Sequence, residues 1–292
     1  MTGDLHCHTR LSDGSMGIED IIALAKKNSV EAIAITDHDC LAGTVRGKII
    51  GERQGIKVIP GVELSSLDSE TGRKAHILCY LADSPDRLEG LCKRNSMARK
   101  RAGQLMMLKA ATRYPITPEL VLKCAAGSTN LYKQHIMHAL MESGCTVTIF
   151  GELFDELFSE KSPDNINVMP KFEDVRTVIN EIHDAGGIAV LAHPYVYDSI
   201  ELMERLTEEK MLDGIEVWHP RQNEEQRKTL EAFAKKNKLL MTGGSDFHGM
   251  YGAKPITIGT CQTPEAQFNE LMGFKAKRKR QMKKQAAAAV TE

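Results

Sequence analysis

The stretch Asp4-Leu5-His6-Cys7-His8, at the start of the chain, decides how the rest of the sequence is interpreted. It has the length and character of a short buried strand. Side chains at positions i and i+2 of a strand leave by the same face, so His6 and His8 point the same way. Imidazole is the commonest metal ligand in proteins. The pair therefore predicts one corner of a metal site, and Cys7 is expected to face away from it and pack in the core.

The composition is that of an ordinary globular protein. The chain has 292 residues, of which 42% are hydrophobic, and a net charge of −1. No apolar run approaches the roughly 18 residues that a membrane span needs, and no signal-peptide pattern precedes the first strand. Seven cysteines without a paired spacing predict reduced thiols. We therefore expect a cytoplasmic protein with no membrane segment.

Strands alternate with helices in two parts of the chain, and this rhythm predicts a parallel sheet or barrel. In the first part, strands are expected at 3–7, 30–36, 57–65 and 74–81, with helices at 18–28 and 41–54. In the second part, strands are expected at 188–192, 213–217 and 239–242, with helices at 172–185, 199–209 and 222–236.

Between the two parts the sequence predicts helices alone. Pro85 opens a long helix to Arg113, and Thr117-Pro118 has the cap and first-turn proline of a second. Two more helices are expected at 131–142 and 150–158. The predicted organisation is a barrel made of 1–82 and 171–262, an all-helical insertion at 83–170, and a C-terminal helix with a basic tail at 263–292. The tail has seven basic residues from Lys275 to Lys284, which fit either a solvated helix end or a nucleic-acid contact.

Histidines and carboxylates follow one predicted strand after another. In parallel α/β folds the functional site collects at the carboxyl ends of the strands, so these side chains are expected to meet. Six imidazoles and three carboxylates exceed the ligands that one metal takes, and the mixed set suits two or three Mn²⁺, Fe²⁺ or Zn²⁺ ions, with Mg²⁺ also acceptable. The nine candidates are His6, His8, Asp13, His38, Glu63, His76, His193, Asp246 and His248.

Enzymes that cleave phosphate esters commonly use a site with several metal ions whose coordination shells have positions open to water and substrate. In that chemistry a metal-bridging hydroxide attacks phosphorus while the metals clamp the phosphoryl oxygens. Arg10 and Arg221 are candidate phosphate ligands, and His219 could bind phosphate or protonate the leaving oxygen. Each of these three also fits an ordinary surface loop. Trp218 could stack a base or simply pack.

The motifs carry a family resemblance. Asp-Leu-His-x-His-Thr, Ser-Asp-Gly, Ile-Thr-Asp-His-Asp, Gly-Val-Glu, Ala-His-Pro and Gly-Ser-Asp-x-His occur in this order, and they resemble the polymerase and histidinol phosphatase (PHP) family. The resemblance covers residues 4–82 and 171–260. It implies an α/β fold, a distorted seven-stranded TIM-like barrel, with a trinuclear metal site.

The resemblance also implies how the ligands divide. The first metal would take His6, His8, Glu63 and Asp246. The second would take Asp13, His38 and His248, and the third would share Glu63 and add His76 and His193. The residues expected to take part in catalysis are Asp246, His193 and His219.

The insertion resembles the subgroup that contains the 3′,5′-bisphosphate nucleotidase and a 5′-to-3′ exoribonuclease. Its segment Tyr132-Lys133-Gln134-His135-Ile136 is similar to that subgroup's Gly-Arg-Pro-His-Ile. Lysine in place of arginine keeps the charge but cannot bind a phosphate in the bidentate way. By this resemblance Lys133 and His135 would close over the site.

The expected function is that of a metal-dependent phosphoesterase, a hydrolase acting on a nucleotide such as a 3′,5′-bisphosphate or on the 5′ end of a short RNA. No protein partner is evident. One alternative is a phosphatase of a small metabolite such as histidinol phosphate, against which the insertion argues. A second is a non-catalytic metal-binding module, against which the complete ligand set argues.

Overall fold

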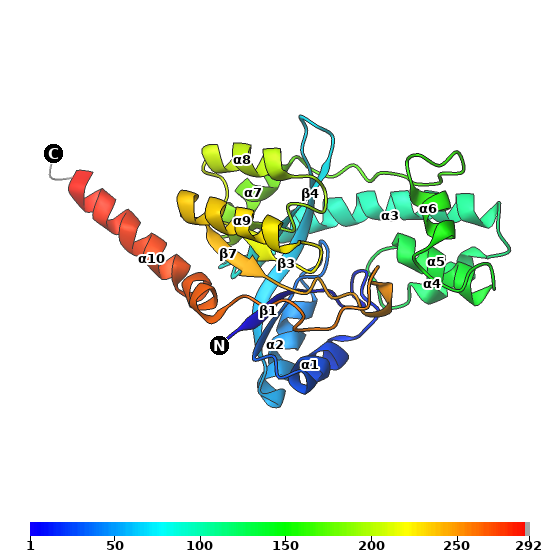
Figure 1. The fold of residues 1–292 in the computed structure, drawn as a ribbon, viewed down its shortest axis with the longest axis horizontal. Coiled ribbons are helices and arrows are strands. Elements are labelled where there is room, and N and C mark those ends of the chain that lie inside the picture. Colours follow the sequence, from blue (N-terminus) through cyan, green and yellow to red (C-terminus); the bar gives the residue numbers. More distant parts are fainter. Residues whose placement is uncertain (290–292) are drawn as a thin grey trace.

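The computed structural model describes residues 1–289, with side chains to residue 280. Seven strands form a single sheet whose spatial order follows the chain. Figure 1 shows this sheet at the centre of the molecule with helices around it. Seven strands with surrounding helices confirm the predicted α/β barrel. The strands are β1 (Gly3–Cys7), β2 (Ala32–Ile35), β3 (Lys57–Leu67), β4 (Lys74–Tyr80), β5 (Ile188–Leu191), β6 (Gly214–Trp218) and β7 (Leu240–Gly243).

The direction of β4 departs from the parallel arrangement that the strand–helix rhythm predicts. It runs antiparallel to both neighbours, β3 and β5, whereas the other neighbouring strands are parallel. The cause is the short connection 68–73, because a parallel crossover needs a dozen or more residues. The beginning of β4 therefore lies at the edge where the parallel strands end, which places Ser65 of β3 opposite His76.

The sheet is nearly closed on itself through a residue outside the strands. Thr263 exchanges backbone hydrogen bonds with Gly3 of β1, at 2.7 and 3.2 Å. Its hydroxyl accepts a hydrogen bond from the Gly243 amide of β7 and donates one to the Gly243 carbonyl. Thr263 thus bridges the first and last strands, and it satisfies backbone groups that an open sheet edge would expose.

Helices cover the outside of the sheet and bury their apolar faces against it. Leu, Ile and Val side chains of β3 to β6 and of α7 to α9 form the largest buried cluster. The expected helices are present, with ends that differ from the predicted ones by a few residues. They are α1 (Ile18–Lys27), α2 (Gly43–Gln54), α7 (Val175–Asp184), α8 (Ile200–Glu208) and α9 (Glu224–Asn237).

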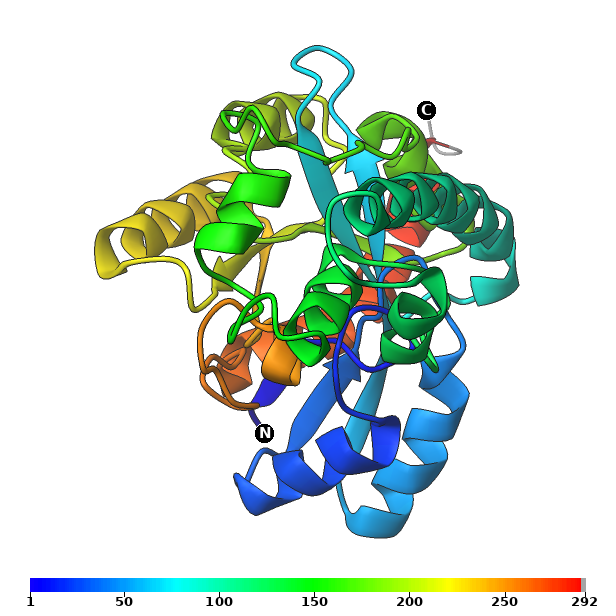
Figure 2. The same ribbon diagram turned by 90° about the vertical axis from the view of Figure 1, so that its right-hand side faces the viewer.

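Between β4 and α7 the regular elements are all helices, and the outer ones lie beside the carboxyl ends of the parallel strands (Figures 1 and 2). The outer half of α3 packs with α4, α5 and α6 around a separate apolar cluster that includes Met106, Ile136 and Leu157. The helices are η1 (Pro85–Leu88), α3 (Glu89–Ala111), α4 (Pro118–Cys124), α5 (Lys133–Glu142) and α6 (Glu152–Phe158). The side chain of Thr117 caps α4, as predicted.

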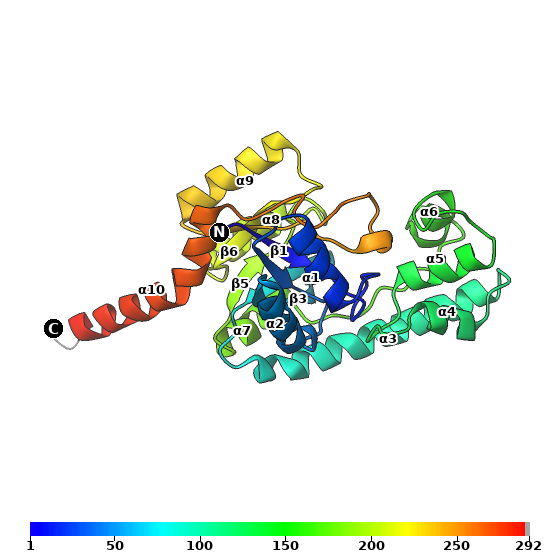
Figure 3. The ribbon, with the colours of Figure 1, turned by 90° about the horizontal axis from the view of Figure 1, so that it is seen from below.

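The last helix, α10 (Glu265–Ala289), begins beside the amino-terminal end of β1, where Glu265 pairs with the Met1 ammonium at 2.6 Å. Figures 1 and 3 both show α10 leaving the barrel on the side opposite α4–α6. Among the described residues, no helix combines the length and the apolar character that crossing a membrane requires.

Candidate metal centre

Glu63 of β3 is the centre of a buried group of imidazoles. Its Oε2 lies 3.1 to 3.3 Å from one ring nitrogen each of His6, His8 and His38. Its Oε1 lies 2.8 Å from His76 Nδ1 and 3.1 Å from His193 Nε2. Burial alone would raise the pKa of Glu63, but the surrounding imidazoles, His38 and His76 foremost, hold it well below its usual value. A carboxylate that stays ionised in such a place suits the bridging of cations.

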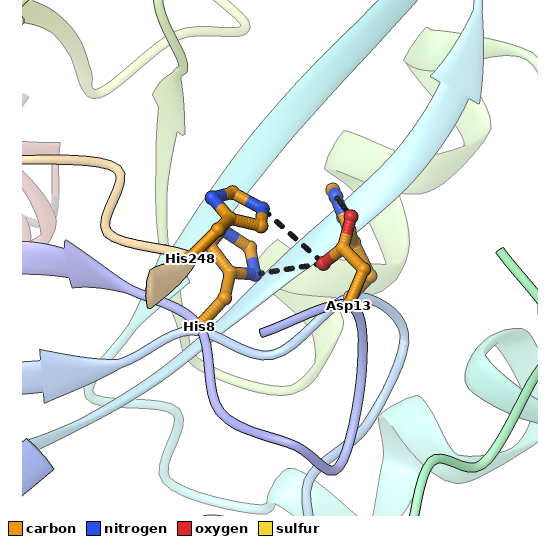
Figure 4. Close-up of side chains that lie close together, drawn as sticks. His8, Asp13 and His248 are labelled. Carbon is orange, nitrogen blue, oxygen red and sulfur yellow. Dashed lines mark ion pairs between the residues drawn. The ribbon is translucent and has the colours of Figure 1, made fainter. Parts of the chain in front are cut away.

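Asp13 organises a second group next to the first. Its Oδ1 lies 3.2 Å from His248 Nε2 and 3.7 Å from His8 Nδ1, and its Oδ2 lies 3.8 Å from His38 Nε2. Figure 4 shows the rings of His8 and His248 lying side by side and facing this carboxylate, with ring centroids 4.2 Å apart. Burial would raise the pKa of Asp13, but His248 and His38 hold it well below its ordinary value.

Asp246 reaches the same cluster from the loop after β7. Its Oδ1 lies 3.5 Å from His6 Nε2 and 3.3 Å from His8 Nε2. The close approach depends on Gly244, since a Cβ there would stand 2.4 Å from the backbone nitrogen of His6.

Asp246 and His193 both have left-handed backbone conformations, with φ of 50° and 28°. Such conformations are costly outside glycine and concentrate at functional sites.

Divalent metals fit this cluster, because several of its polar atoms are buried without a hydrogen bond. Three nitrogens face Glu63 Oε2 at 3.1 to 3.3 Å without the alignment of a hydrogen bond. A buried polar atom left unpaired costs roughly 1–3 kcal/mol, and a cation held between these lone pairs removes that cost. In the described part of the chain, the unpaired atoms of the cluster are His6 Nε2, His8 Nε2, His38 Nδ1, His193 Nδ1 and Asp13 Oδ1.

The ligand atoms fall into four overlapping sets, in each of which all atoms lie within 4.8 Å of one another. The sets are His8, Asp13, His38 and His248; His6, Glu63 and His193; His6, His8 and Asp246; and His38, Glu63 and His76. All nine predicted ligands therefore come together. His193 groups with His6 rather than with His76, so the division of the ligands among three metals stays a prediction.

Glu216 in the middle of β6 is a site residue that the sequence reasoning missed. It is fully buried, and its Oε1 lies 2.9 Å from His6 Nδ1. Its Oε2 accepts a hydrogen bond from the His193 amide at 2.8 Å. A carboxylate on the far nitrogen fixes the tautomer and orientation of a metal-binding imidazole. The signal was present in the sequence as a carboxylate inside the apolar run Gly214–Trp218.

Asp39, one residue after His38, connects the cluster to α3. Its carboxylate accepts hydrogen bonds from Ser65 of β3, from Asn95 Nδ2 at 2.8 Å and from Arg99 at 3.2 Å. The Arg99 guanidinium lies between the rings of Tyr132 and Phe172, 4.8 and 4.9 Å from their centroids. Two side chains of α3 thus fix the strand ends that present His38 and Glu63.

A cavity of about 160 Å³ opens directly onto the cluster. Seven of the nine ligand candidates line it: Asp13, His38, Glu63, His76, His193, Asp246 and His248. Its lining also includes two cationic side chains, a glutamine and several aromatic or aliphatic groups: Arg221, Lys254, Gln134, Phe150, Val196, Tyr197, Tyr251 and Ile256. Metal-type ligands, cationic groups and aromatic groups therefore line the same cavity.

The predicted substrate-binding residues separate into two groups. His219 and Arg221 line the cavity, and His219 Nε2 lies 3.3 Å from Asp246 Oδ2. Arg10, Lys133 and His135 are not among the residues that line it.

Each residue of the second group has other contacts. Exposed Arg10 donates a hydrogen bond to the Ser15 carbonyl, and Lys133 Nζ lies 5.1 Å from the centre of the Phe158 ring. His135 Nδ1 accepts a hydrogen bond from the Tyr132 amide at 3.2 Å. The motif predicted Lys133 and His135 to close over the site, but the direction of α5 presents Gln134 there instead, 3.4 Å from Asp13 Oδ2.

The structure also tests the predictions for Cys7 and Trp218, which lie next to site residues in the sequence. Cys7 is fully buried and packs with Ile18, Ile21 and Phe247, as expected, and all seven cysteines are free. Trp218 packs against the core cluster of the barrel and is not part of the cavity lining, so the structure favours packing over base stacking.

Comparison with known proteins places the chain in a family. The PHP domain family model matches residues 4–192. A phosphoribosyl 1,2-cyclic phosphate 1,2-diphosphodiesterase from Eggerthella lenta is 35% identical over 87% of this chain and 97% of its own length. A 5′-3′ exoribonuclease from Haemophilus influenzae is 30% identical over 84% of this chain and 89% of its own.

A solved structure agrees with the sequence relatives. A protein from Bifidobacterium adolescentis, described as a metal-dependent phosphoesterase, has a TM-score of 0.82 and 29% identity over 92% of this chain and 95% of its own. The ligand cluster, the barrel and the relatives lead to one conclusion: this chain belongs to the PHP domain family and is a hydrolase, a metal-dependent phosphoesterase.

Proposed function

We propose that the chain hydrolyses phosphate esters of ribonucleotides, either a 3′,5′-bisphosphate or the 5′ end of a short RNA. The observation that carries this proposal is the cavity, whose lining combines residues of the metal-ligand cluster with the cationic Arg221 and Lys254 and the aromatic Phe150 and Tyr251. Cationic groups suit phosphate oxygens, and aromatic faces suit a base or a ribose.

The metals would be held by His6, His8, Asp13, His38, Glu63, His76, His193, Asp246 and His248. When bound, divalent ions supply Lewis acidity, which neutralises phosphoryl oxygens and acidifies water. The protein's own contribution is to fix these ligands rigidly. Glu216 orients His6, and Asp39 holds the strand end at His38.

His219 would give a proton to the leaving oxygen. Its Nδ1 accepts a hydrogen bond from the Arg221 amide at 3.2 Å, so in the neutral ring the proton is on Nε2. Nε2 faces Asp246 and the cavity. Arg221, two residues later, would orient the phosphoryl group from the same loop.

Residues 83–170 would form a cap domain that limits the size of the substrate. Gln134, in the first turn of α5, and Phe150, just before α6, both reach the cavity. Tyr251 of the barrel loop is tied to this segment, because its hydroxyl lies 2.8 Å from His138 Nδ1. A cap fixed at these places would admit a nucleotide or a single strand more readily than a duplex.

A second candidate is hydrolysis of a cyclic phosphate on phosphoribose. The 35% identity to the Eggerthella lenta diphosphodiesterase over nearly the whole of that protein favours it. Both candidates have a phosphorylated ribose as substrate, and the same residues would serve them. Histidinol phosphate and a purely structural metal module remain the alternatives to be excluded.

The experiment is a substrate panel with manganese: a 3′,5′-bisphosphate, 5′-phosphorylated and 5′-hydroxyl oligoribonucleotides, phosphoribosyl 1,2-cyclic phosphate and histidinol phosphate. We expect turnover of a phosphorylated ribose compound in the wild type and none in Asp246→Ala. Exposed Asp184→Asn is the matched control and should behave as wild type. Turnover of histidinol phosphate alone would overturn the ribonucleotide proposal, and no turnover of any compound would overturn hydrolysis of this substrate class.

A further inference from the structure

The sequence of α10 contains a concentrated run of basic residues that the proposed reaction does not use. Lys275 to Lys284 contains seven basic residues and no acidic one. The whole chain has a net charge of −1, so with +7 in this stretch the remaining residues sum to −8. Positive charge is therefore concentrated in this stretch, whereas the rest of the chain is net negative.

The first half of α10 is anchored on the barrel. Phe268 and Leu271 are buried with Leu5 and Leu240 in an apolar cluster inside the sheet. Lys275 Nζ donates a hydrogen bond to the Leu81 carbonyl at 2.7 Å and pairs with Asp83. The basic stretch thus begins at a fixed point of the structure.

Beyond this anchor the helix extends away from the body of the molecule, as Figures 1 and 3 show. Arg278 still contacts Asp213 at 3.4 Å. Lys277, Lys279 and Arg280 are exposed and have no carboxylate partner among the side chains that the structure describes. Like charges three or four residues apart on a helix repel, so this arrangement is unfavourable without a partner. A polyanion would relieve the repulsion.

We infer that this part of α10 is a docking arm for the phosphate backbone of RNA. Ten helical residues span about 15 Å, a length over which a duplex presents several phosphates. A membrane surface fits less well, because Ala276 and Met282 are the only apolar residues from Lys275 to Lys284, and an interfacial helix needs an apolar face. The choice of RNA over other polyanions rests on the proposed function.

The arm is separate from the active site. It leaves the barrel at the amino-terminal end of β1, on the side opposite α4–α6 (Figures 1 and 3). The metal cluster lies at the other end of the parallel strands, where His8, His38 and Asp246 follow β1, β2 and β7. It would therefore hold a part of the RNA distant from the reacting phosphate, and hydrolysis of a mononucleotide should not depend on it.

The test is binding of a fluorescent RNA hairpin with a 5′-hydroxyl end to metal-free protein, measured by anisotropy at several salt concentrations. The triple variant Lys277→Gln, Lys279→Gln and Arg280→Gln should weaken binding at least about tenfold at 0.1 M salt. It should also flatten the log–log salt slope by two to three, roughly one for each phosphate that is no longer neutralised. The charge-keeping variant Lys277→Arg with Lys279→Arg should bind as wild type.

The matched control removes three charges elsewhere, as Lys235→Gln, Lys236→Gln and Lys238→Gln at the end of α9. Equal weakening in both triple variants would show a net-charge effect and overturn the inference, as would unchanged binding in the α10 variant. Stronger binding to anionic lipid vesicles than to RNA would assign the arm to a membrane and also overturn it. Because the assay needs no turnover, failure of the proposed function would leave this result interpretable.

Discussion

His76 Nδ1 lies 2.8 Å from Glu63 Oε1, although the two residues belong to neighbouring strands that run in opposite directions. Glu63 precedes the carboxyl end of β3, and His76 follows the beginning of β4. The reversal at 68–73 brings both to the same edge of the sheet. His76 is thus added to the cluster by β4. In a wholly parallel barrel, the beginning of this strand would lie at the opposite edge of the sheet.

Glu216 should control metal affinity without being a ligand. Glu216→Gln removes the carboxylate that faces His6 Nδ1 and accepts a hydrogen bond from the His193 amide. Outer partners of metal-binding imidazoles typically contribute 10–100-fold in metal affinity, so we expect a loss of about that size. Metal affinity can be measured by competition with a chelating dye. The same substitution at exposed Glu225, which leaves Glu216 in place, should retain affinity within a few fold, and an unchanged affinity in Glu216→Gln would refute the orienting role.

His219 should affect proton transfer and not metal binding. His219→Asn keeps an atom that can accept a hydrogen bond from the Arg221 amide. It removes the imidazole, which is the group that could release a proton into the cavity. Loss of a general acid typically costs 10²–10⁴-fold, so kcat should fall by about that factor while the metal content stays that of the wild type. A leaving group of low pKa, such as nitrophenolate, should restore much of the rate. If it restores none, the assigned role is wrong.

Arg99 should stabilise the fold through Asp39. Removing one partner of a buried ion pair costs about 3–5 kcal/mol, so Arg99→Met should lower the free energy of unfolding by that order. Arg99→Lys should recover only part of this, because an ammonium cannot stack between Tyr132 and Phe172 as the planar guanidinium does. Urea denaturation measures the effect. Exposed Arg101→Met on the same helix should change stability by no more than about 0.5 kcal/mol.

His135 should make stability depend on pH. Burial lowers the pKa of His135 to about 4, while the unfolded chain has the ordinary value near 6.5. Between these two pKa values the unfolded state binds a proton at His135 and the folded state does not. The contribution of His135 to the free energy of unfolding is therefore fully present above pH 6.5 and decreases as the pH falls toward 4. A shift of this size corresponds to about 3 kcal/mol.

The measurement compares the wild type with His135→Gln by urea denaturation at pH 7.5 and 5, both metal-free. Glutamine keeps an acceptor for the Tyr132 amide but does not titrate, so the variant should lose less stability at pH 5 than the wild type. His183→Gln, in which the replaced ring is partly exposed beside Asp213, serves as control. Equal losses in all three proteins would contradict the assignment.

Much of the barrel and of the ligand cluster could be predicted from local pattern. Each apolar strand ends at or near a histidine or carboxylate, and parallel strands bring those ends together, so the ligands could be identified before their contacts were known. The glycine before Ser245 could likewise be recognised as allowing a close backbone approach, which Gly244 and His6 now show.

The remaining features depend on tertiary contacts. The reversal of β4 was set by the length of one turn, and the choice of Gln134 over Lys133 at the cavity was set by the rotation of α5. Glu216 looked like one polar residue in an apolar strand, since its partners His6 and His193 are distant in sequence. Local periodicity carries no information on such pairings.

The most direct test of the central claim is a titration of metal-free protein with Mn²⁺ while phosphate or mononucleotide release from the best substrate of the panel is followed. We predict no turnover without metal, a rise that saturates at two to three equivalents, and no rise at all in Asp246→Ala. Full turnover by the chelator-treated protein, or a titration of Asp246→Ala that follows the wild type, would contradict the assignment of this cluster as the metal centre that performs the hydrolysis.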